Sequence, residues 1–428
     1  MSEPRYTILP RVVRADREAT VTIAPVSAED RFDPGVHYDV LHFPLEHLPE
    51  SPGRNGSPLA ARVDDGSLVV TAVFPDEQEH KLTVAVGQGD ARKEIAALRL
   101  YSLRDDLFVR RPYKGDFHIH SNRSDGREPP AEVMAHCRRI GLDFAAVTDH
   151  RRYAPSVEAE QAFEGVALDL LICRGEEVHP PDNPVHIINF GGRFSVNDQF
   201  AGPAYRAEVG EIERSLGPLP PGVDRYLYAS SVWCFNKIRE GGGVGVFCHP
   251  YWLVKHGYDV PGPLTTHLWR TRPFDALELI GGYHVWEAES NHLQVVRYLE
   301  ERRAGPELPV IGASDAHGCL RGELFGWYYS IVFSPTCELA DLAASVRAGY
   351  SVAVEARPNE FPRPFGPFRL AKFACFLIRE AYPAHDALCA PEGDLMLAHV
   401  RGDASAVGAL ASRKGQVARL FSGLWGPG

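Results

Sequence analysis

Short apolar runs alternate with polar positions along residues 1–112. The runs are VTIAPV, HYDVLHF, SLVVTAVF, HKLTVAV and AALRLYSL, and polar, glycine and proline segments separate them. Alternation with a period of two is typical of strands that bury one face, and closely spaced strands of this kind are typical of a β-sandwich. We therefore expect a small all-β sandwich domain over residues 1–112.

From residue 113 the apolar runs alternate with amphipathic segments. The expected strands are GDFHIH, FAAV, LLIC, HIINF, VGVF, ALELI and VIGAS. Between the first two, PPAEVMAHCRRIG begins with prolines, carries apolar residues at helical spacing and ends at Gly141, which predicts a helix. Further helices are expected near 230–240, 285–304 and 337–348. Repeated strand–helix units predict an α/β fold with a parallel barrel over residues 113–355.

The last part of the chain is rich in proline and then in amphipathic segments. FRLAKFACFLIREAY and SAVGALASRKGQVARLF both have apolar residues at helical spacing. We expect residues 356–428 to form a C-terminal helical extension packed on the barrel.

Composition narrows the class of protein. A length of 428 residues suits two or three domains, and a net charge of −11 argues against general nucleic-acid binding through bulk electrostatics. The sequence contains no run of 18 apolar residues, so we expect no membrane span. No signal peptide is apparent at the start. The eight cysteines are scattered without a CxxC pair, which is typical of free thiols, so we expect a cytoplasmic location.

Residues of the metal-ligand type stand at or near the ends of successive apolar runs. They are His118, His120, Asp125, His150, Glu177, His186, His249, Asp315 and His317. The carboxyl ends of barrel strands meet at one face, and imidazoles with carboxylates bind Zn²⁺, Mn²⁺ or Fe²⁺. His118 and His120 share one face because strand side chains repeat every two residues. The pattern predicts a centre of two or three divalent metal ions.

The motifs that carry these residues resemble those of one known family. GDFHIHSNRSDG, AAVTDH, GEEV, HIINFGG, CHP and GASDAHG are similar, in order, to the motifs of the PHP (polymerase and histidinol phosphatase) superfamily. The stretch RPYKGDFHIHSNRSDGREPPAEVMAHCRRIGLDFAAVTDH resembles its carbaryl-hydrolase-type branch, which often has a β domain ahead of the PHP domain. The resemblance spans residues 112–355 and implies a distorted (β/α)7 barrel with up to three Zn, Mn or Fe ions.

The resemblance also implies which residues share a metal ion. The first site would be His118, His120, Glu177 and Asp315, the second Glu177, His186 and His249, and the third Asp125, His150 and His317. The family's G-x-E pattern selects Glu177 over Glu176, and strand alternation would then turn Glu176 away from the site. Two departures bear on substrate choice: Cys248 stands where the branch often has Asn, and Arg151–Arg152 follow TDH.

Other residues near the motifs have competing interpretations. Arg123, Arg151 and Arg321 follow site motifs closely. Any one of them alone would suit a solvated loop charge, whereas the set would suit an anionic small-molecule substrate such as a phosphoester. Asp149 would either orient an imidazole or cap a turn, and both readings stay open. His179 and His284 lie near motifs but off the family pattern, so we expect structural roles for them.

The favoured function is a multinuclear metal-dependent hydrolase acting on a phosphoester, with a hydroxide bridging two metal ions as the attacking group. Glu177, Asp315 and His317 are the expected catalytic residues. One alternative is a carbamate or carboxylic ester hydrolase, which would suit aromatic residues around the site. These are Tyr153, Tyr251, Trp252, Tyr283 and Trp286. A second alternative is a non-catalytic, metal-stabilised binding module.

Overall fold

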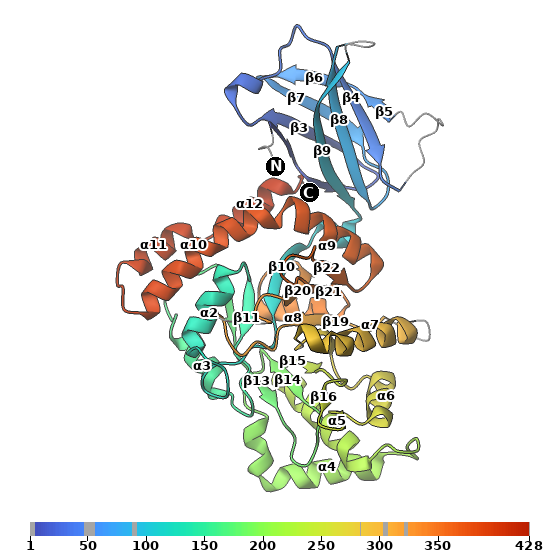
Figure 1. Ribbon diagram of the computed structural model, residues 1–428, viewed down its shortest axis with the longest axis vertical. Helices are drawn as coiled ribbons and strands as arrows, with labels where there is room; N and C mark the ends of the chain where they lie inside the picture. The colour runs from blue at the N-terminus through green and yellow to red at the C-terminus, as the bar shows by residue number, and fades with distance from the viewer. Residues whose placement is uncertain are drawn as a thin grey trace. The chain divides into compact units, whose positions relative to one another are not determined.

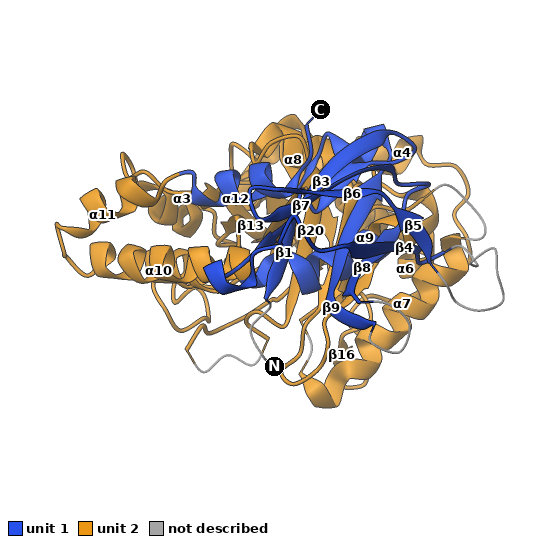
Figure 2. Ribbon diagram, turned by 90° about the horizontal axis from the view of Figure 1, so that it is seen from above, with its two compact units in different colours: residues 1–111, 372–383, 415–428 blue, residues 112–371, 384–414 orange. Residues whose placement is uncertain are grey.

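The computed structural model describes residues 5–46, 56–87, 92–282, 284–302, 307–320 and 324–427. Figure 2 shows two compact units, and neither is continuous in sequence. Unit 1 contains residues 1–111, 372–383 and 415–428, and unit 2 contains 112–371 and 384–414. The expected C-terminal extension over 356–428 is therefore divided between both units instead of forming a part of its own.

Unit 1 is built around two sheets with one shared core (Figure 1). One sheet has the order β1 (Tyr6–Leu9), β3 (Glu18–Pro25), β7 (Ser67–Val73) and β6 (Ala61–Asp64). The other has the order β2 (Val12–Arg14), β9 (Lys93–Leu103), β8 (Glu79–Val86), β4 (Tyr38–Pro44) and β5 (Ser57–Leu59). Alternate residues such as Val21 and Ile23 of β3, or Leu82 and Val84 of β8, are buried in this core. The period of two in the sequence thus corresponds to one buried face per sheet.

Unit 1 also contains helical segments that the sequence pattern placed in the C-terminal extension. Part of α9 (Phe368–Glu380) packs on β9, where the Tyr101 and Phe373 ring centroids are 4.9 Å apart. Arg379 Nη2 lies 2.6 Å from Glu79 Oε2. The backbone N–H of Arg11 donates to the carbonyl of Leu424 in α12 (Gln416–Leu424) at 2.8 Å. The compact unit is therefore not made of strands alone.

Unit 2 contains two further sheets with helices around them. The first sheet has the order β12 (Leu171–Cys173), β11 (Phe144–Ala146), β10 (Arg111–Asp116), β20 (Tyr328–Ser334), β21 (Ser351–Glu355) and β22 (Arg363–Phe365). The second has the order β13 (Gly175–Val178), β14 (Ile187–Phe190), β15 (Val244–Phe247), β18 (Ala276–Gly281) and β19 (Val310–Ala313). The strands expected from FAAV, LLIC, HIINF, VGVF, ALELI and VIGAS all occur, and the fold is a mixed α/β one.

The strand directions correct the expectation of an all-parallel barrel. β14 runs antiparallel to both β13 and β15, and in the described residues no continuous ladder joins the two sheets into a closed ring. Two isolated bridges connect them instead, Ile119 with Ala316 and His150 with Glu177. Both bridges form at the ends of strands, next to or at candidate metal ligands. The two sheets therefore come together at the candidate site.

The helices of unit 2 mostly follow the sequence pattern. They are α2 (Pro130–Arg139), α3 (Ala154–Gln161), α4 (Pro203–Ser215), α5 (Arg225–Glu240), α6 (Gly262–Thr271), α7 (Ala288–Arg302), α8 (Leu339–Arg347), α10 (Tyr382–Val400) and α11 (Ala406–Arg413), with α10 beginning in unit 1. α2, α5, α7 and α8 correspond to the expected helices, whereas α3, α4, α6 and α10 were not expected. Phe117, Phe144, Ile188, Val246 and Ile311 belong to one buried cluster contributed by both sheets.

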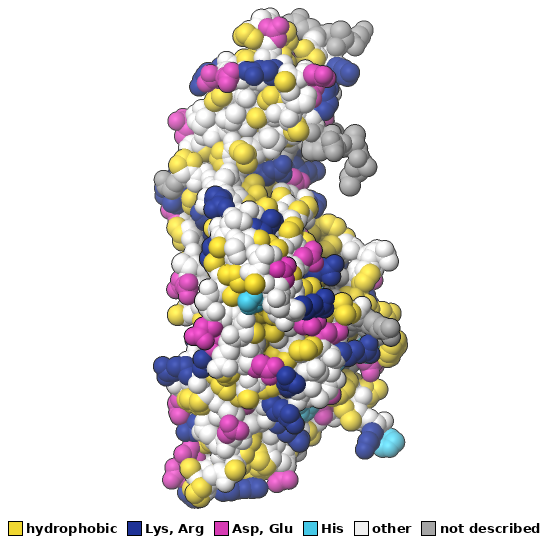
Figure 3. All heavy atoms as spheres, turned by 90° about the vertical axis from the view of Figure 1, so that its left-hand side faces the viewer, with side chains coloured by type: hydrophobic (Ala, Val, Ile, Leu, Met, Phe, Trp, Pro, Cys, Tyr) yellow, Lys and Arg dark blue, Asp and Glu magenta, His cyan; other side chains and the backbone are white. Residues whose placement is uncertain are grey.

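The surface carries charges of both signs. On the face drawn in Figure 3, Lys and Arg side chains are interspersed with Asp and Glu instead of forming one basic patch. Within the described part of the chain, no helix has both the length and the apolar character needed to cross a membrane.

A buried network of charges joins α10 to α2 and β11 within unit 2. Arg138 is fully buried and donates to Glu392 Oε2 at 2.8 Å and to Asp143 Oδ1 at 3.0 Å. His385 lies between two carboxylates, with Nε2 2.9 Å from Asp143 Oδ1 and Nδ1 2.8 Å from Asp386 Oδ1. The side chains of α10 therefore compensate charges that unit 2 buries beneath it.

His385 makes the stability of this network dependent on pH. Burial lowers the pKa of His385, but Asp143 and Asp386 outweigh burial and raise the pKa well above its usual value. The stabilisation is complete below the unfolded pKa of about 6.5 and is lost as pH rises through the folded pKa. In urea unfolding, the free-energy difference between the wild type and His385→Gln should therefore be largest near pH 6 and shrink toward pH 9. A difference that stays constant over this range would contradict the assignment of a charged His385.

Candidate metal centre

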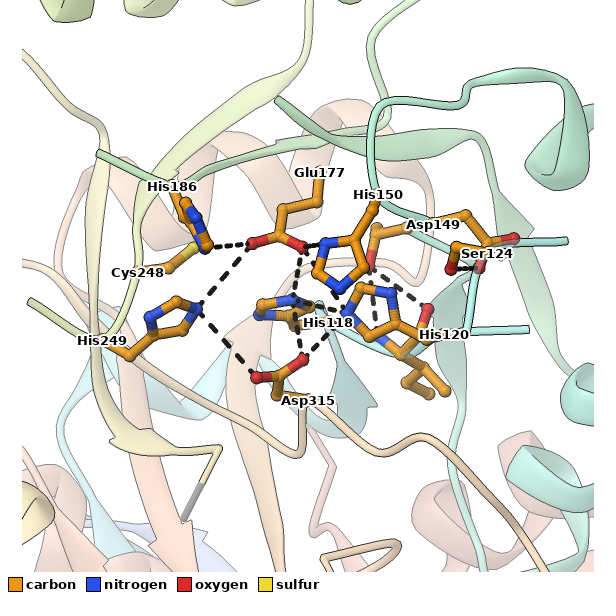
Figure 4. A network of polar contacts seen from close by, with 12 residues as sticks. His118, His120, Ser124, Asp149, His150, Glu177, His186, Cys248, His249 and Asp315 are labelled. Atoms are coloured by element: carbon orange, nitrogen blue, oxygen red, sulfur yellow. Dashed lines mark hydrogen bonds and ion pairs between the residues drawn. The ribbon is translucent and has the colours of Figure 1, made fainter. Parts of the chain in front are cut away.

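All nine residues expected as metal ligands come together in unit 2. Figure 4 labels His118, His120, His150, Glu177, His186, His249 and Asp315 from this set. Nitrogen–oxygen contacts of 4.0 Å or less connect the whole set into one cluster. His118 and His120 follow β10, His150 follows β11, and Glu177 lies in β13. His249 follows β15, and Asp315 and His317 follow β19. The cluster thus combines side chains from both sheets at the ends that the isolated bridges join.

Four donor atoms form a compact group that we call the first donor group. They are His118 Nε2, His120 Nε2, Asp315 Oδ1 and Glu177 Oε2. His118 Nε2 lies 3.1 Å from both His120 Nε2 and Asp315 Oδ1, and Glu177 Oε2 lies 3.6 Å from either imidazole. Four ligands at about 2.0–2.1 Å from a tetrahedral ion lie about 3.3 Å from one another. The spacing of this group fits such an ion.

The second donor group uses the other oxygen of Glu177. Glu177 Oε1 lies 2.9 Å from His186 Nδ1 and 3.8 Å from His249 Nε2. Oε2 faces the first donor group and Oε1 faces the second. The Glu177 carboxylate therefore stands between the positions that two metal ions would occupy. This is the arrangement that a carboxylate shared by two metal ions requires.

The third donor group is Asp125, His150 and His317. Asp125 Oδ2 lies 3.5 Å from His150 Nε2, and Asp125 Oδ1 lies 3.3 Å from His317 Nε2. The His120 ring lies 4.2 Å from the rings of both histidines, so it adjoins this group as well as the first. The side chains of Asp125 and His317 are 57% and 36% exposed, whereas His118 and His120 are buried. The third position is therefore the one open to solvent.

Buried polar atoms in the centre indicate that a cation would fit there. Among the described residues, neither oxygen of Glu177 nor Nδ1 of His186 has a hydrogen-bond partner, although each Glu177 oxygen lies within ion-pair distance of an imidazole nitrogen. Burial lowers the pKa of His249, but Glu177, Glu278 and Asp315 outweigh it and raise the pKa to about 9. Buried carboxylates that hold imidazoles protonated supply the negative charge that a divalent ion needs. The donor set fits Zn²⁺, Mn²⁺ or Fe²⁺.

The backbone at the centre adopts conformations that are rare for residues with a side chain. Asp315 has a φ of 51° and Arg151 a φ of 59°, and both follow strand ends. A Cβ at Gly126 would lie 2.6 Å from the carbonyl oxygen of His120, so the SNRSDG loop needs glycine there. Strained residues of this kind are typical of functional sites, where the surrounding structure holds them in place.

The structure separates the two adjacent glutamates of β13. Glu177 faces the cluster, whereas Glu176 faces a loop where it accepts from Ser195 Oγ at 2.8 Å and from Asn197 Nδ2 at 2.8 Å. Strand alternation accounts for the opposite directions. Asp149, for which two roles were open, accepts from the backbone N–H of Ser121 at 2.7 Å and from Ser124 Oγ, so its contacts are those of a loop cap.

His179 joins the cluster although it lies off the family motif. His179 Nε2 is 3.0 Å from His150 Nδ1 and 3.3 Å from Glu177 Oε2. Burial lowers the pKa of His179 to about 4, which leaves the ring neutral, so its Nε2 can accept a hydrogen bond from His150 Nδ1. The expectation of a purely structural role therefore needs correction. The signal that could have found it is the spacing of two residues from Glu177, which places both side chains on one face.

The three arginines expected to bind substrate differ in their surroundings. Arg123 donates to both carboxylate oxygens of Glu158, at 2.9 and 2.7 Å, so its guanidinium is already occupied. Arg151 is exposed, directly follows His150 and forms no ion pair with any residue that the structure describes. Arg321 lies outside the described residues. Arg151 is thus the member of the set best placed for an anion.

Of the aromatic residues expected around the site, Trp252 stands beside the second donor group. Trp252 precedes the hairpin of β16 (Leu253–Val254) and β17 (Gly257–Tyr258), is 37% exposed, and its ring lies 5.6 Å from that of His249. Trp286 is 72% exposed. Tyr153 donates to the carbonyl of Gly192 at 2.6 Å, and Tyr283 lies outside the described residues. Apolar surface therefore borders the candidate centre on the His249 side.

No protein-family model and no curated protein matches the chain. Among solved structures, it is similar to a two-domain protein from Bacteroides vulgatus that contains a predicted PHP-like metal-dependent phosphoesterase. The identity is 18%, the TM-score 0.37, and the match covers 57% of this chain and 65% of that one. It is also similar to an amidohydrolase from Chromobacterium violaceum with bound sulfate and no metal, at 20% identity and a TM-score of 0.31. That match covers 48% of this chain and 87% of that one.

The chain thus spans less than two thirds of the length of the first of these structures. Neither similarity concerns the carbaryl-hydrolase-type branch, so that resemblance stays a prediction. The function of the centre is therefore inferred from its donor geometry.

Proposed function

We propose that the protein is a metal-dependent hydrolase of the PHP type, and that its substrate is a phosphoester. The observation that carries the proposal is the pair of donor groups that share Glu177, with a third, solvent-exposed group beside them. Two isolated bridges bring the sheets together at this place, and we interpret the seven strands β10, β11, β13, β14, β15, β18 and β19 as an open, distorted barrel.

The residues of the chain would divide the work between binding and positioning. His118, His120 and Asp315 would hold one ion with Glu177, while His186 and His249 would hold another on the other oxygen of Glu177. Divalent ions bound there would activate water and offset the charge on the substrate's oxygens. Asp125, His150 and His317 would form the third position and, being the most exposed group, lie nearest to an incoming substrate.

A carboxylic ester or carbamate is the second candidate substrate. Two observations favour it: the Arg123 guanidinium is held by Glu158, and exposed aromatic surface borders the centre beside His249. An uncharged ester would need fewer cationic contacts and more apolar surface than a phosphoester. The same donor groups would serve both reactions, because both need activated water.

One experiment tests the proposal and separates the candidates. The purified protein is analysed for bound metals and then assayed in parallel with p-nitrophenyl phosphate, bis(p-nitrophenyl) phosphate and p-nitrophenyl acetate. We expect two or three divalent ions per chain and preference for a phosphoester, lost on chelation and restored by Mn²⁺ or Zn²⁺. Preference for the acetate ester would transfer the proposal to the second candidate. A metal-loaded protein that hydrolyses none of the three would favour a binding module.

Arg151→Ala tests whether a guanidinium binds the anionic group. If it does, kcat/KM for the phosphoester should fall by one to two decades through a rise in KM, since such a contact contributes about 1.5–3 kcal/mol. Hydrolysis of the acetate ester and metal content should stay unchanged. Arg139→Ala removes an equally charged but remote surface group and serves as the control. Equal losses for both substrates would argue against anion recognition by Arg151.

A further inference from the structure

We propose that Glu278 is a positioning residue of the metal centre, acting through His118. It is not one of the nine ligands. Its carboxylate would hold the proton on His118 Nδ1, so that the lone pair of Nε2 is available to an ion in the first donor group. The proposal rests on the metal centre proposed above and extends it to a tenth residue.

The contact between the two side chains is direct and buried. Glu278 Oε2 lies 2.9 Å from His118 Nδ1, and both side chains are fully inaccessible to solvent. The opposite nitrogen, His118 Nε2, lies 3.1 Å from Asp315 Oδ1 and from His120 Nε2. The two nitrogens of one ring therefore have different partners, one a lone carboxylate and the other the donor group. A carboxylate bonded to the remote nitrogen fixes both the tautomer and the orientation of a metal-ligating imidazole.

Burying the carboxylate of Glu278 costs free energy, because the charge loses its contact with water. Glu278 Oε1 is buried without a hydrogen-bond partner in the described residues, so the His118 contact is its principal compensation. Cys248 also lies near this pair, and its Sγ is directed to the carbonyl of Val246 at 3.6 Å. An apolar residue of similar size would avoid the desolvation cost of a carboxylate. The carboxylate is thus better explained by what it does to His118 than by fold stability.

The backbone around Glu278 is shaped to direct its side chain. The ladder between β18 and β19 shifts register between Glu278 and Ile280, and such irregularities re-aim side chains near functional sites. The segment beyond it is fixed from α7, because Gln294 Nε2 donates to the carbonyl of Leu279 at 2.9 Å and Asn291 Oδ1 accepts from the Gly281 N–H at 3.0 Å. A Cβ at Gly281 would lie 1.9 Å from the Ala313 carbonyl oxygen, so the backbones of β18 and β19 lie very close together at their ends. Asp315 comes two residues after Ala313. These contacts hold Glu278 behind His118.

The test compares metal binding by Glu278→Gln and Glu278→Leu in the full-length protein. Apoprotein is titrated with Zn²⁺ against a fluorescent chelator, and the visible spectrum is recorded after loading with Co²⁺. We expect Glu278→Leu to bind the tightest ion about 10–100-fold more weakly, as is usual for loss of such partners. Glu278→Gln, whose amide oxygen still accepts the Nδ1 proton, should show an intermediate loss. The Co²⁺ spectrum should change, because the ligand field at His118 changes.

Asp275→Asn is the matched control. Asp275 directly precedes β18, is buried and pairs with Arg239 at 2.8 Å, away from the ligands. It should lower thermal stability and leave the Zn²⁺ affinity and Co²⁺ spectrum of the folded protein unchanged. If both Glu278 variants fold and keep the wild-type Zn²⁺ affinity and Co²⁺ spectrum, the positioning role is overturned while the metal centre stands. If the wild type itself binds neither ion, the proposed function is overturned together with this role.

Discussion

Glu177→Gln is expected to reduce kcat/KM by about 100-fold or more, a loss typical of removing a group that stabilises the transition state. The substitution keeps the shape of the side chain and removes its charge. Both oxygens of Glu177 are buried, and each faces a different donor group, so the variant weakens two positions at once. We therefore expect metal content to fall in parallel with activity.

The matched control is Glu176→Gln, which removes a buried carboxylate from the neighbouring position of the same strand. Glu176 accepts hydrogen bonds from Ser195 and Asn197 and faces away from the cluster, so its loss should affect stability more than metal content. Metal analysis and steady-state kinetics of both variants decide the matter. A larger loss of bound metal in Glu176→Gln would show that the assignment of the shared carboxylate is off by one residue.

Arg138→Ala is expected to destabilise unit 2 by about 3–5 kcal/mol, the usual effect of removing one partner from a buried ion pair. The guanidinium is fully buried, and its removal takes an ion-pair partner from Glu392 and leaves Asp143 paired with His385. Urea unfolding followed by circular dichroism measures the difference. Metal loading must be the same in both samples, because a ligand that binds the folded state adds stability.

The neighbouring residue provides the control within the same helix. Arg139 pairs with Asp394 at 3.0 Å, but the two side chains are 49% and 60% exposed. Solvent screens such a pair, so Arg139→Ala should cost no more than about 1 kcal/mol. Similar effects of the two substitutions would mean that α10 does not depend on the buried network.

The sequence predicted which residues gather at the candidate centre better than the topology that carries them. A histidine or carboxylate at the end of an apolar run is visible locally. The family's G-x-E pattern selects Glu177, and strand alternation then turns Glu176 away from the site. The antiparallel direction of β14 has no such local sign, because HIINF has the same apolar pattern in either direction. His179 lies off the family motif, and its spacing of two residues from Glu177 is the local sign of its position.

The C-terminal part shows a second limit of local patterns. α10 contains Pro391, and its apolar and polar residues are mixed around the helix instead of forming separate faces, so no helical periodicity marks it. Its buried charges, His385 and Glu392, have partners about 240 residues or more away along the chain, at Asp143 and Arg138. Pairing over such separations depends on tertiary structure and leaves no signature in either segment by itself. The sequence gives no local sign of the role of Glu278 for the same reason, because its partner His118 lies 160 positions earlier.

The interleaving of the two units has a consequence for synthesis of the protein. Multidomain chains usually fold one domain at a time as they leave the ribosome. Here unit 2 needs residues 384–414, and unit 1, which contains the first strands, also needs residues 372–383 and 415–428. The strands β1 to β9 must therefore wait through the translation of more than 300 further residues before α12 can join them. Nascent chains stalled ahead of residue 372 should expose incomplete cores to chaperones and proteases.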